Sequence, residues 1–209
     1  MPRPRFLKLD ADRQAAILDA ARAEFSAHGY RGASQNRIIE AAGVSKGAMY
    51  YYFDDKADLY VTVVRREFAG FGEVMTIGDF ATVDQFWAEL ESMFMRSTDF
   101  YLQSPETLAL ARSVARSVTS HGPPPGFQEL LGELHGVTED LVSRGQAVGA
   151  VRTDLPTSLI VDLVMKLGEA MDYWFAEHWA EIDLDELPQF NHKLVDVFKR
   201  VAAPDRTDD

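Results

Sequence analysis

Cysteine is missing from this sequence of 209 residues. Its absence excludes disulfide bridges, thiolate metal sites and cysteine nucleophiles. Long apolar runs are missing too, since none approaches the roughly 20 residues that a helix needs to cross a bilayer. The first ten residues, MPRPRFLKLD, lack the apolar core of a signal peptide. These absences predict a cytoplasmic protein without a membrane partner.

Signals for β-strands and for catalysis are also scarce. β-branched runs are short, period-2 alternation is not sustained, and no glycine-rich phosphate loop follows a strand. The five histidines are scattered without the HExxH spacing of a zinc site. His135 with Glu139, and His178 with Glu181, have helical spacings that arise by chance in an acidic helical protein. We therefore expect no enzymatic activity, no cofactor and no metal site.

Charge is unevenly distributed along the chain. The net charge is −12, which at first argues against nucleic acid as a partner. Residues 1–60 nevertheless contain nine Lys or Arg and eight Asp or Glu, whereas the remainder contains 12 and 25. Because an acidic surface repels DNA phosphates, any contact with DNA is expected from the near-neutral N-terminal part.

Apolar residues recur at helical spacing along most of the chain, which predicts an all-α protein of about nine helices. Glycines interrupt the pattern at Gly70–Asp79 and indicate a break between domains. The expected helices span approximately residues 10–28, 34–42, 45–53, 54–71, 83–102, 105–120, 130–148, 156–179 and 187–201.

The stretch from Ser34 to Phe53 has the pattern of a helix-turn-helix. Ser34 and Ser45 are suitable N-caps for two short helices, and Gly43 allows the chain to reverse between them. Val44 fills the corner of the turn. Two short helices joined by such a turn form a motif that binds the major groove of DNA.

On a helical wheel, the third helix separates its consecutive aromatic residues. Met49 and Phe53 fall on one face, which we expect to be buried, with Tyr52 at its edge. Gly47 and Tyr51 fall on the opposite face, flanked by Ala48 and Tyr50. Lys46 lies in the first turn, where free N–H groups favour a phosphate. The outer face is thus expected to meet a large partner.

The stretch AGVSKGAMYYYFDDKADLY (Ala42–Tyr60), preceded by RQAAILDAARAEFSAHGYRGAS, closely resembles the N-terminal domain of TetR-family transcriptional regulators. The resemblance covers about residues 8–60. It implies an N-terminal three-helix helix-turn-helix DNA-binding domain followed by a larger helical domain for ligand binding and dimerisation. By function, the chain then divides into residues 1–56 and 57–209.

The resemblance also implies a set of DNA-binding residues. They are Ser34, Asn36, Arg37, Ser45, Lys46, Gly47, Ala48, Tyr50, Tyr51 and Lys56. Three positions depart from the family pattern: Ala48 replaces a threonine that binds phosphate, Tyr52 replaces a histidine, and Ile39 replaces an alanine. Arg3, Arg5 and Lys8 form either a basic arm that reaches a minor groove or a frayed terminus.

The expected helix 156–179 has an apolar stripe that covers more than half of its circumference. A single core contact needs a stripe of only about 100°, so we expect this helix to contact both its own domain and a second subunit. The last helix is its natural companion. The resemblance agrees, because the family dimerises through its last two long helices as a four-helix bundle. The predicted interface residues are Val161, Val164, Gly168, Phe175, Leu194 and Phe198.

The resemblance further implies a ligand cavity among the middle helices. The candidate lining residues are Phe71, Trp87, Phe94, Tyr101, Met171, Trp174 and His178, and this set favours an aromatic or lipophilic effector. Arg112 and Arg116, one turn apart, are candidates to receive an anionic group or to form a solvated face.

Together, these features predict a ligand-responsive transcriptional regulator. Its expected partners are double-stranded operator DNA with a palindromic sequence, a small-molecule effector and a second copy of the chain. Repression is the favoured mode of action. An activator or a partner-binding protein on the same fold is the alternative, although the retained Lys46, Gly47, Tyr50 and Lys56 argue against loss of DNA binding.

Overall fold

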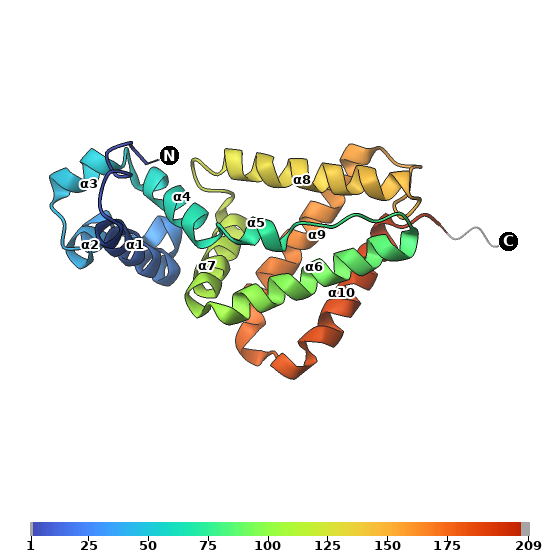
Figure 1. The fold of residues 1–209 in the computed structure, drawn as a ribbon. Coiled ribbons are helices and arrows are strands. Elements are labelled where there is room, and N and C mark those ends of the chain that lie inside the picture. Colours follow the sequence, from blue (N-terminus) through green and yellow to red (C-terminus); the bar gives the residue numbers. More distant parts are fainter. Residues whose placement is uncertain (1, 206–209) are drawn as a thin grey trace. The chain divides into compact units, whose positions relative to one another are not determined.

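The computed structural model describes residues 2–205, and within that range helices are the only regular secondary structure (Figure 1). This confirms the predicted fold class. The α-helices are α1 (Ala11–Gly32), α2 (Gln35–Ala41), α3 (Lys46–Tyr52), α4 (Lys56–Glu67), α5 (Phe71–Val74), α6 (Val83–Gln103), α7 (Pro105–His121), α8 (Gln128–Ala147), α9 (Thr157–His178) and α10 (Leu187–Ala202). Two 3-10 turns, Trp179–Glu181 and Leu184–Glu186, join α9 to α10. The short α5 lies in the glycine-containing stretch where no helix was expected.

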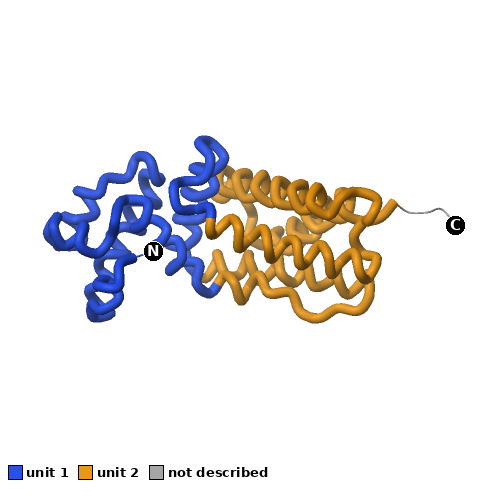
Figure 2. Tube along the Cα trace, turned by 90° about the horizontal axis from the view of Figure 1, so that it is seen from above, with its two compact units in different colours: residues 1–70, 104–128 blue, residues 71–103, 129–209 orange. Residues whose placement is uncertain are grey.

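The helices form two compact units (Figure 2). Unit 1 comprises residues 1–70 and 104–128, and unit 2 comprises residues 71–103 and 129–209. The chain therefore leaves unit 1 after α4 and returns to it for α7. The proposed functional division between residues 56 and 57 is a separate question and stays a prediction.

In unit 1, α1 is the central helix and packs against α2, α4 and α7. Ile17, Ala21 and Phe25 are fully buried along its inner side, at the i, i+4 spacing that places side chains on one face of a helix. Gly29 interrupts α1 with φ of 65°, a left-handed conformation that costs glycine little. The last turn of α1 therefore leaves the axis of the rest of the helix.

In unit 2, α6 and α9 both pack against α10, and α5 packs against α6. A buried hydrophobic cluster contains residues from α6, α8, α9 and α10, among them Trp87, Val142, Ile160 and Val195. α8 lies so close to α6 that a Cβ atom at Gly145 would come within 2.8 Å of the Phe86 ring. Glycine is thus required there for close packing.

Candidate nucleic-acid interface

Two short helices of unit 1, α2 and α3, form the expected helix-turn-helix. The Ser34 hydroxyl accepts a hydrogen bond from the Arg37 backbone N–H at 3.4 Å, and the Ser45 hydroxyl accepts one from the Ala48 N–H at 3.1 Å. Gly43 has φ of 60° in the turn between the helices. Both predicted caps and the predicted turn are confirmed. The caps matter because such short helices cannot satisfy their first N–H groups internally.

The inner and outer faces of α3 are separated as the helical wheel predicts. Met49 and Phe53 are each 1% exposed, whereas Tyr50 is 44% exposed and Tyr51 47%. Lys46 and Gly47 are exposed beside them. The two buried side chains anchor α3 to unit 1, and the two tyrosines extend outward from a surface that carries little other side-chain bulk.

A salt bridge connects the start of α2 to α1. The Glu24 carboxylate of α1 accepts hydrogen bonds from the Arg37 Nε at 2.9 and 3.0 Å and from the Ser34 backbone N–H at 2.7 Å. The hydrogen bond from Arg37 is the main cause that lowers the pKa of Glu24, and the Ser34 N–H adds to it. Arg37 also donates to the Gly32 carbonyl. Arg37 thus holds α2 in place, while the neighbouring Asn36 is exposed.

Lys56, at the start of α4, has contacts inside unit 1. Its Nζ donates to the carbonyls of Arg31 and Ala33 at 3.3 and 3.1 Å, and it lies 4.8 Å from the centre of the Tyr30 ring. Desolvation lowers the pKa of Lys56. Its ammonium group therefore caps the end of α1, a function that the spacing of residues along the chain did not reveal.

The N-terminal segment is packed onto α3, which sequence reasoning missed. Phe6 is 1% exposed, and its ring centre lies 4.8 Å from that of Phe53 and 6.1 Å from that of Tyr52. Arg3 donates to the Asp54 carboxylate at 2.8 Å and to the Tyr50 carbonyl at 3.1 Å. A large aromatic residue within a basic, proline-containing start was the signal that could have indicated an anchor.

Arg5 lies on the outer side of this N-terminal segment. Its guanidinium carbon is 4.2 Å from the centre of the Tyr51 ring, a cation–π geometry. The neighbouring basic residue Lys8 is exposed. The packed segment thus adds positive charge beside the exposed tyrosines of α3.

The predicted ligand residues fall into three places within unit 2. Met171 and Trp174 line an apolar cavity of about 190 Å³ between α9 and α10. Phe71 and Tyr101 have ring centres 5.4 Å apart, beside Phe100. His178 stacks on Trp174 and so belongs with the first group. Trp87 is in the buried core, and Phe94 packs against Phe198 of that core. The structure therefore brings them together in groups rather than around one cavity.

Asp172 of α9 lies near Tyr101 of α6, a pairing absent from the sequence prediction. Partial desolvation raises the pKa of Asp172 to about 6, and the Glu169 carboxylate adds to the shift. Desolvation also raises the pKa of Tyr101, with the Asp172 charge as a second cause. Because Asp172 remains accessible to water, its charged form keeps part of its hydration. The two groups introduce polarity among otherwise apolar side chains.

The predicted dimer residues do not share one exposed face. Val161 is fully buried and Phe198 is 9% exposed within the core of unit 2, and Val164 packs against the same core. Phe175 and Leu194 line the cavity between α9 and α10. Val161, at 0% exposure, is enclosed by its own chain. The assignment of the other residues to a subunit interface stays a prediction. A Cβ atom at Gly168 would have open space around it.

A different apolar stripe is exposed on α9. Leu159 is 43% exposed, Leu163 is 42% and Trp174 is 41%, and Ala170 is exposed between them. Their spacing of four, seven and four residues keeps them on one side of the helix. Val197 of α10 is 40% exposed. Lys166, whose side chain is 77% exposed, lies on the same side of α9 and interrupts these apolar residues. Several large apolar side chains exposed on one face nevertheless favour an interaction surface.

Within residues 2–205, no group of three or more His, Asp or Glu side chains is arranged to hold a metal ion. None of the helices in the same range combines the length and apolarity that crossing a membrane requires.

Comparison with known proteins supports the N-terminal assignment. Residues 17–63 match the family model of bacterial regulatory proteins of the tetR family. The HTH-type transcriptional repressor AcnR of Corynebacterium diphtheriae is 27% identical over 152 residues, which cover 71% of this chain and 73% of that protein. The HTH-type transcriptional repressor NicS of Pseudomonas putida is 29% identical over 142 residues, which cover 66% of each.

Solved structures extend the similarity to the whole fold. A TetR family regulator from Chloroflexus aurantiacus has a TM-score of 0.64 at 20% identity, with 98% of this chain and 99% of that chain covered. The fatty acid degradation regulator FadR from Bacillus halodurans has a TM-score of 0.65 at 18% identity, with 90% and 96% covered. At such low identity, the similarity shows the fold alone.

Proposed function

We propose that this chain, which belongs to the TetR family of bacterial regulatory proteins, represses transcription as a homodimer on a palindromic operator. The observation that carries the proposal is the face of α3. Met49 and Phe53 hold the helix down, while Lys46, Tyr50 and Tyr51 stay exposed. The relatives named as repressors support this mode of action. Since operator DNA lies in the cytoplasm of bacteria, we place the protein there.

Recognition would combine groove contacts with phosphate contacts. The small side of α3, at Gly47 and Ala48, lets the helix backbone approach the floor of a major groove. Tyr50 and Lys46 would bind phosphates, and Tyr51 would meet base edges. Ser34 and Ser45 would present the starts of α2 and α3, where free N–H groups attract phosphate. Ala48 carries no hydroxyl, so Tyr50 and Lys46 bear more of the phosphate binding.

Three further residues of the predicted DNA surface differ in how freely they can reach DNA. Arg37 and Lys56 are engaged with Glu24 and with backbone carbonyls. We propose that they position α2 and α4 and reach phosphates only from those fixed places. Asn36 is exposed at the start of α2, from where it can approach a base edge.

The exposed apolar side chains of α9 support the proposed dimer. Leu159, Leu163 and Trp174, with Val197 of α10, form an apolar surface that water contacts in the single chain. The cavity between α9 and α10, of about 190 Å³, is also lined by apolar side chains. We propose that a second copy covers this surface with its own α9 and α10. The two copies of α3 would then enter successive major grooves about one helical turn apart.

An effector would act from unit 2. We propose a small, mainly apolar or aromatic molecule that contacts Phe71 and Tyr101, with a polar group facing Asp172. A ligand that favours a dimer with the wrong spacing of its two α3 helices would lower the DNA-bound population. A differential affinity of about 2–3 kcal/mol would change operator affinity roughly 30- to 150-fold.

The test of DNA recognition uses a double variant of α3. The DNA upstream of the chain's own gene is first footprinted to find the protected site. Lys46→Ala combined with Tyr50→Phe should weaken binding to that site. The slope of the logarithm of the binding constant against the logarithm of the salt concentration should also become shallower, by about one for each phosphate that the variant no longer binds. Lys193→Ala, an exposed lysine of α10, is the matched control. Unchanged binding by the double variant, at an unchanged melting temperature, would refute the assignment of this face to DNA.

A further inference from the structure

A cavity of about 270 Å³ lies within unit 1, between the end of α1 and α7. It is formed by residues 26–31 and by side chains between residues 113 and 121. Four serines, two arginines and two histidines are among its eleven lining residues, and no Asp or Glu is among them. In a chain with a net charge of −12, this lining is rich in hydroxyl groups and basic side chains. The nearby Glu24 carboxylate lies outside the lining, 3.8 Å from the Nε2 atom of His28.

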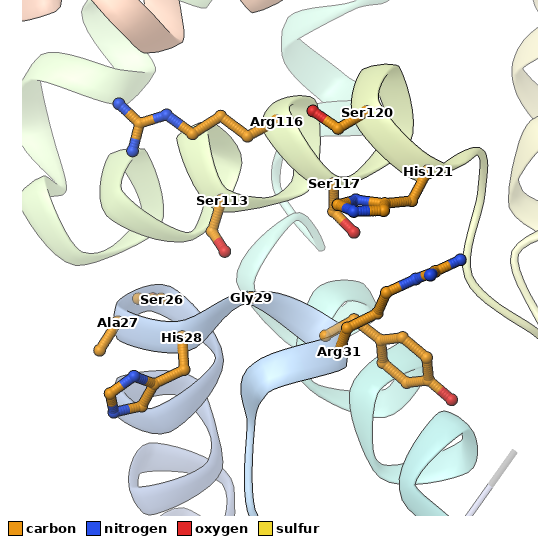
Figure 3. Close-up of a pocket in the computed structure, with 11 residues that line it drawn as sticks. Ser26, Ala27, His28, Gly29, Arg31, Ser113, Arg116, Ser117, Ser120 and His121 are labelled. Atoms are coloured by element: carbon orange, nitrogen blue, oxygen red, sulfur yellow. The ribbon is translucent and has the colours of Figure 1, made fainter.

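The shape of the cavity depends on the break in α1. Gly29 has φ of 65° and ψ of 173°, a conformation that is essentially restricted to glycine. The turn after it carries Arg31 away from the main axis of α1. Figure 3 shows Ser113 and Ser117 pointing from α7 towards this end of α1, and Arg31 extending towards His121. Side chains from both helices thus converge on one space.

One lining group has an unmet hydrogen-bonding need. The Ser26 hydroxyl is buried and has no hydrogen-bond partner, a situation that normally costs a protein about 1–3 kcal/mol. The nearby Ser113 hydroxyl is satisfied, because it donates to the Phe25 carbonyl at 2.8 Å.

We propose that this cavity binds a small oxyanion, either a tetrahedral phosphate or sulfate group or a carboxylate. Arg31 would donate to it from α1, and Ser117 and His121 from α7. A guanidinium group forms paired hydrogen bonds with such anions, and these are among the strongest in proteins. The volume is sufficient for an inorganic anion or a small organic acid and too small for most drug-sized ligands.

The position of the site gives its occupant a regulatory effect. The turn that carries Arg31 also supplies the anchors of the helix-turn-helix: Lys56 donates to the carbonyls of Arg31 and Ala33, and Arg37 donates to the carbonyl of Gly32. An anion that connects Arg31 to α7 would therefore hold this turn, and the start of α2 after it, more rigidly within unit 1.

The test measures anion binding by the full chain without DNA, so its outcome does not depend on the proposed repressor function. Sodium sulfate, phosphate and acetate are titrated at constant ionic strength, with chloride as the balancing anion. Isothermal calorimetry and melting temperature are followed together. Saturable binding with a rise in melting temperature is expected for at least one anion. A response to sulfate and phosphate indicates a tetrahedral ligand, and a response to acetate alone indicates a carboxylate.

Variants locate the site. Arg31→Gln should weaken binding roughly 10- to 100-fold, the loss expected for a charged hydrogen bond, and Ser117→Ala should weaken it less. Arg31→Lys should retain part of the affinity. Arg112→Gln, one turn from Arg116 on α7 and absent from the lining, is the matched control and should bind as the parent protein does.

Hydrogen exchange supplies an independent readout. The bound anion should slow exchange in the peptides that contain Arg31 and Ser117, and should leave α10 unchanged. The proposal is overturned if no anion binds saturably, or if Arg31→Gln and Arg112→Gln bind alike.

Discussion

Phe6 offers the sharpest test of how the recognition helix is held. Its side chain is 1% exposed and contacts Phe53, whose own side chain is 1% exposed at the end of α3. The change Phe6→Ala removes a buried aromatic ring from the junction between the N-terminal segment and α3. Leu7 is the next residue and is 63% exposed, so Leu7→Ala is a matched control in the same segment.

The magnitude follows from burial and ring contacts. Burying a phenylalanine side chain contributes about 1.5–3 kcal/mol, and each aromatic pair adds roughly 0.5–1.5 kcal/mol. With the two ring contacts to Phe53 and Tyr52, these contributions add to about 2.5–6 kcal/mol. Phe→Ala changes in protein cores cost about 3–5 kcal/mol, and we expect a loss at the lower end of that range. The loss of stability cannot exceed the free energy with which the whole N-terminal segment binds to unit 1. Once the segment detaches, Arg3 and its contacts are released as well, and nothing more can be lost.

Urea denaturation and operator binding are measured for both variants. Phe6→Ala should lower the free energy of unfolding of unit 1 by about 3 kcal/mol, whereas Leu7→Ala should change it by less than about 0.5 kcal/mol. Operator affinity should fall for Phe6→Ala, since Arg3 no longer holds the carbonyl of Tyr50 and the side chain of Asp54. Equal stability of the two variants would refute the reasoning, because a detached segment would make Phe6 and Leu7 equivalent.

Three other outcomes are expected. Glu24→Gln should lower the free energy of unfolding at pH 7. Its difference from the parent protein should shrink as the pH falls below about 4.5, because the lowered pKa of Glu24 gives stability that protonation removes. Denaturation at pH 7 and 3.5 tests this, and a difference that does not change with pH would contradict it. Leu163→Glu should shift sedimentation towards the monomer by placing a charge in the exposed stripe of α9, and Thr153→Glu in an exposed loop should not; a dimeric Leu163→Glu would exclude this interface. Asp172 has a pKa raised to about 6, so its native form binds the extra proton and stability should decline as the pH rises from about 4 to 6. Asp172→Asn should lack this small decline in melting temperature, and identical profiles would show that the carboxylate is not desolvated.

The helix-turn-helix was predictable in detail because its signals are local. A serine cap, a left-handed glycine and a second serine cap act on neighbouring backbone groups, and the structure confirms them at Ser34, Gly43 and Ser45. The separation of buried and exposed faces on α3 is also a local signal, because it depends only on the spacing of residues within that helix. Burial of Met49 and exposure of Tyr50 follow from the helical period once one anchor is known.

Interactions between distant residues were not predictable. Lys56 had the pattern of a surface lysine, yet its Nζ caps the end of α1. Arg112 and Arg116 are paired by their spacing, and only Arg116 lines the cavity next to α1. Phe6 stands among the residues of a basic arm and is buried. Each outcome depends on the position of a remote helix. The spacing of residues within one helix carries no information about that position.

The sequence by itself determined the helical class, the caps of the short helices and the two faces of α3, because backbone hydrogen bonding and the period of 3.6 residues act within a few positions. It also determined that α9 is apolar around more than half of its circumference. Only the tertiary structure decided which part of that stripe is internal: Val161 and Val164 pack into the core, whereas Leu159 and Leu163 remain exposed. A wide stripe is compatible with either orientation, and the positions of α6 and α10 select one of them.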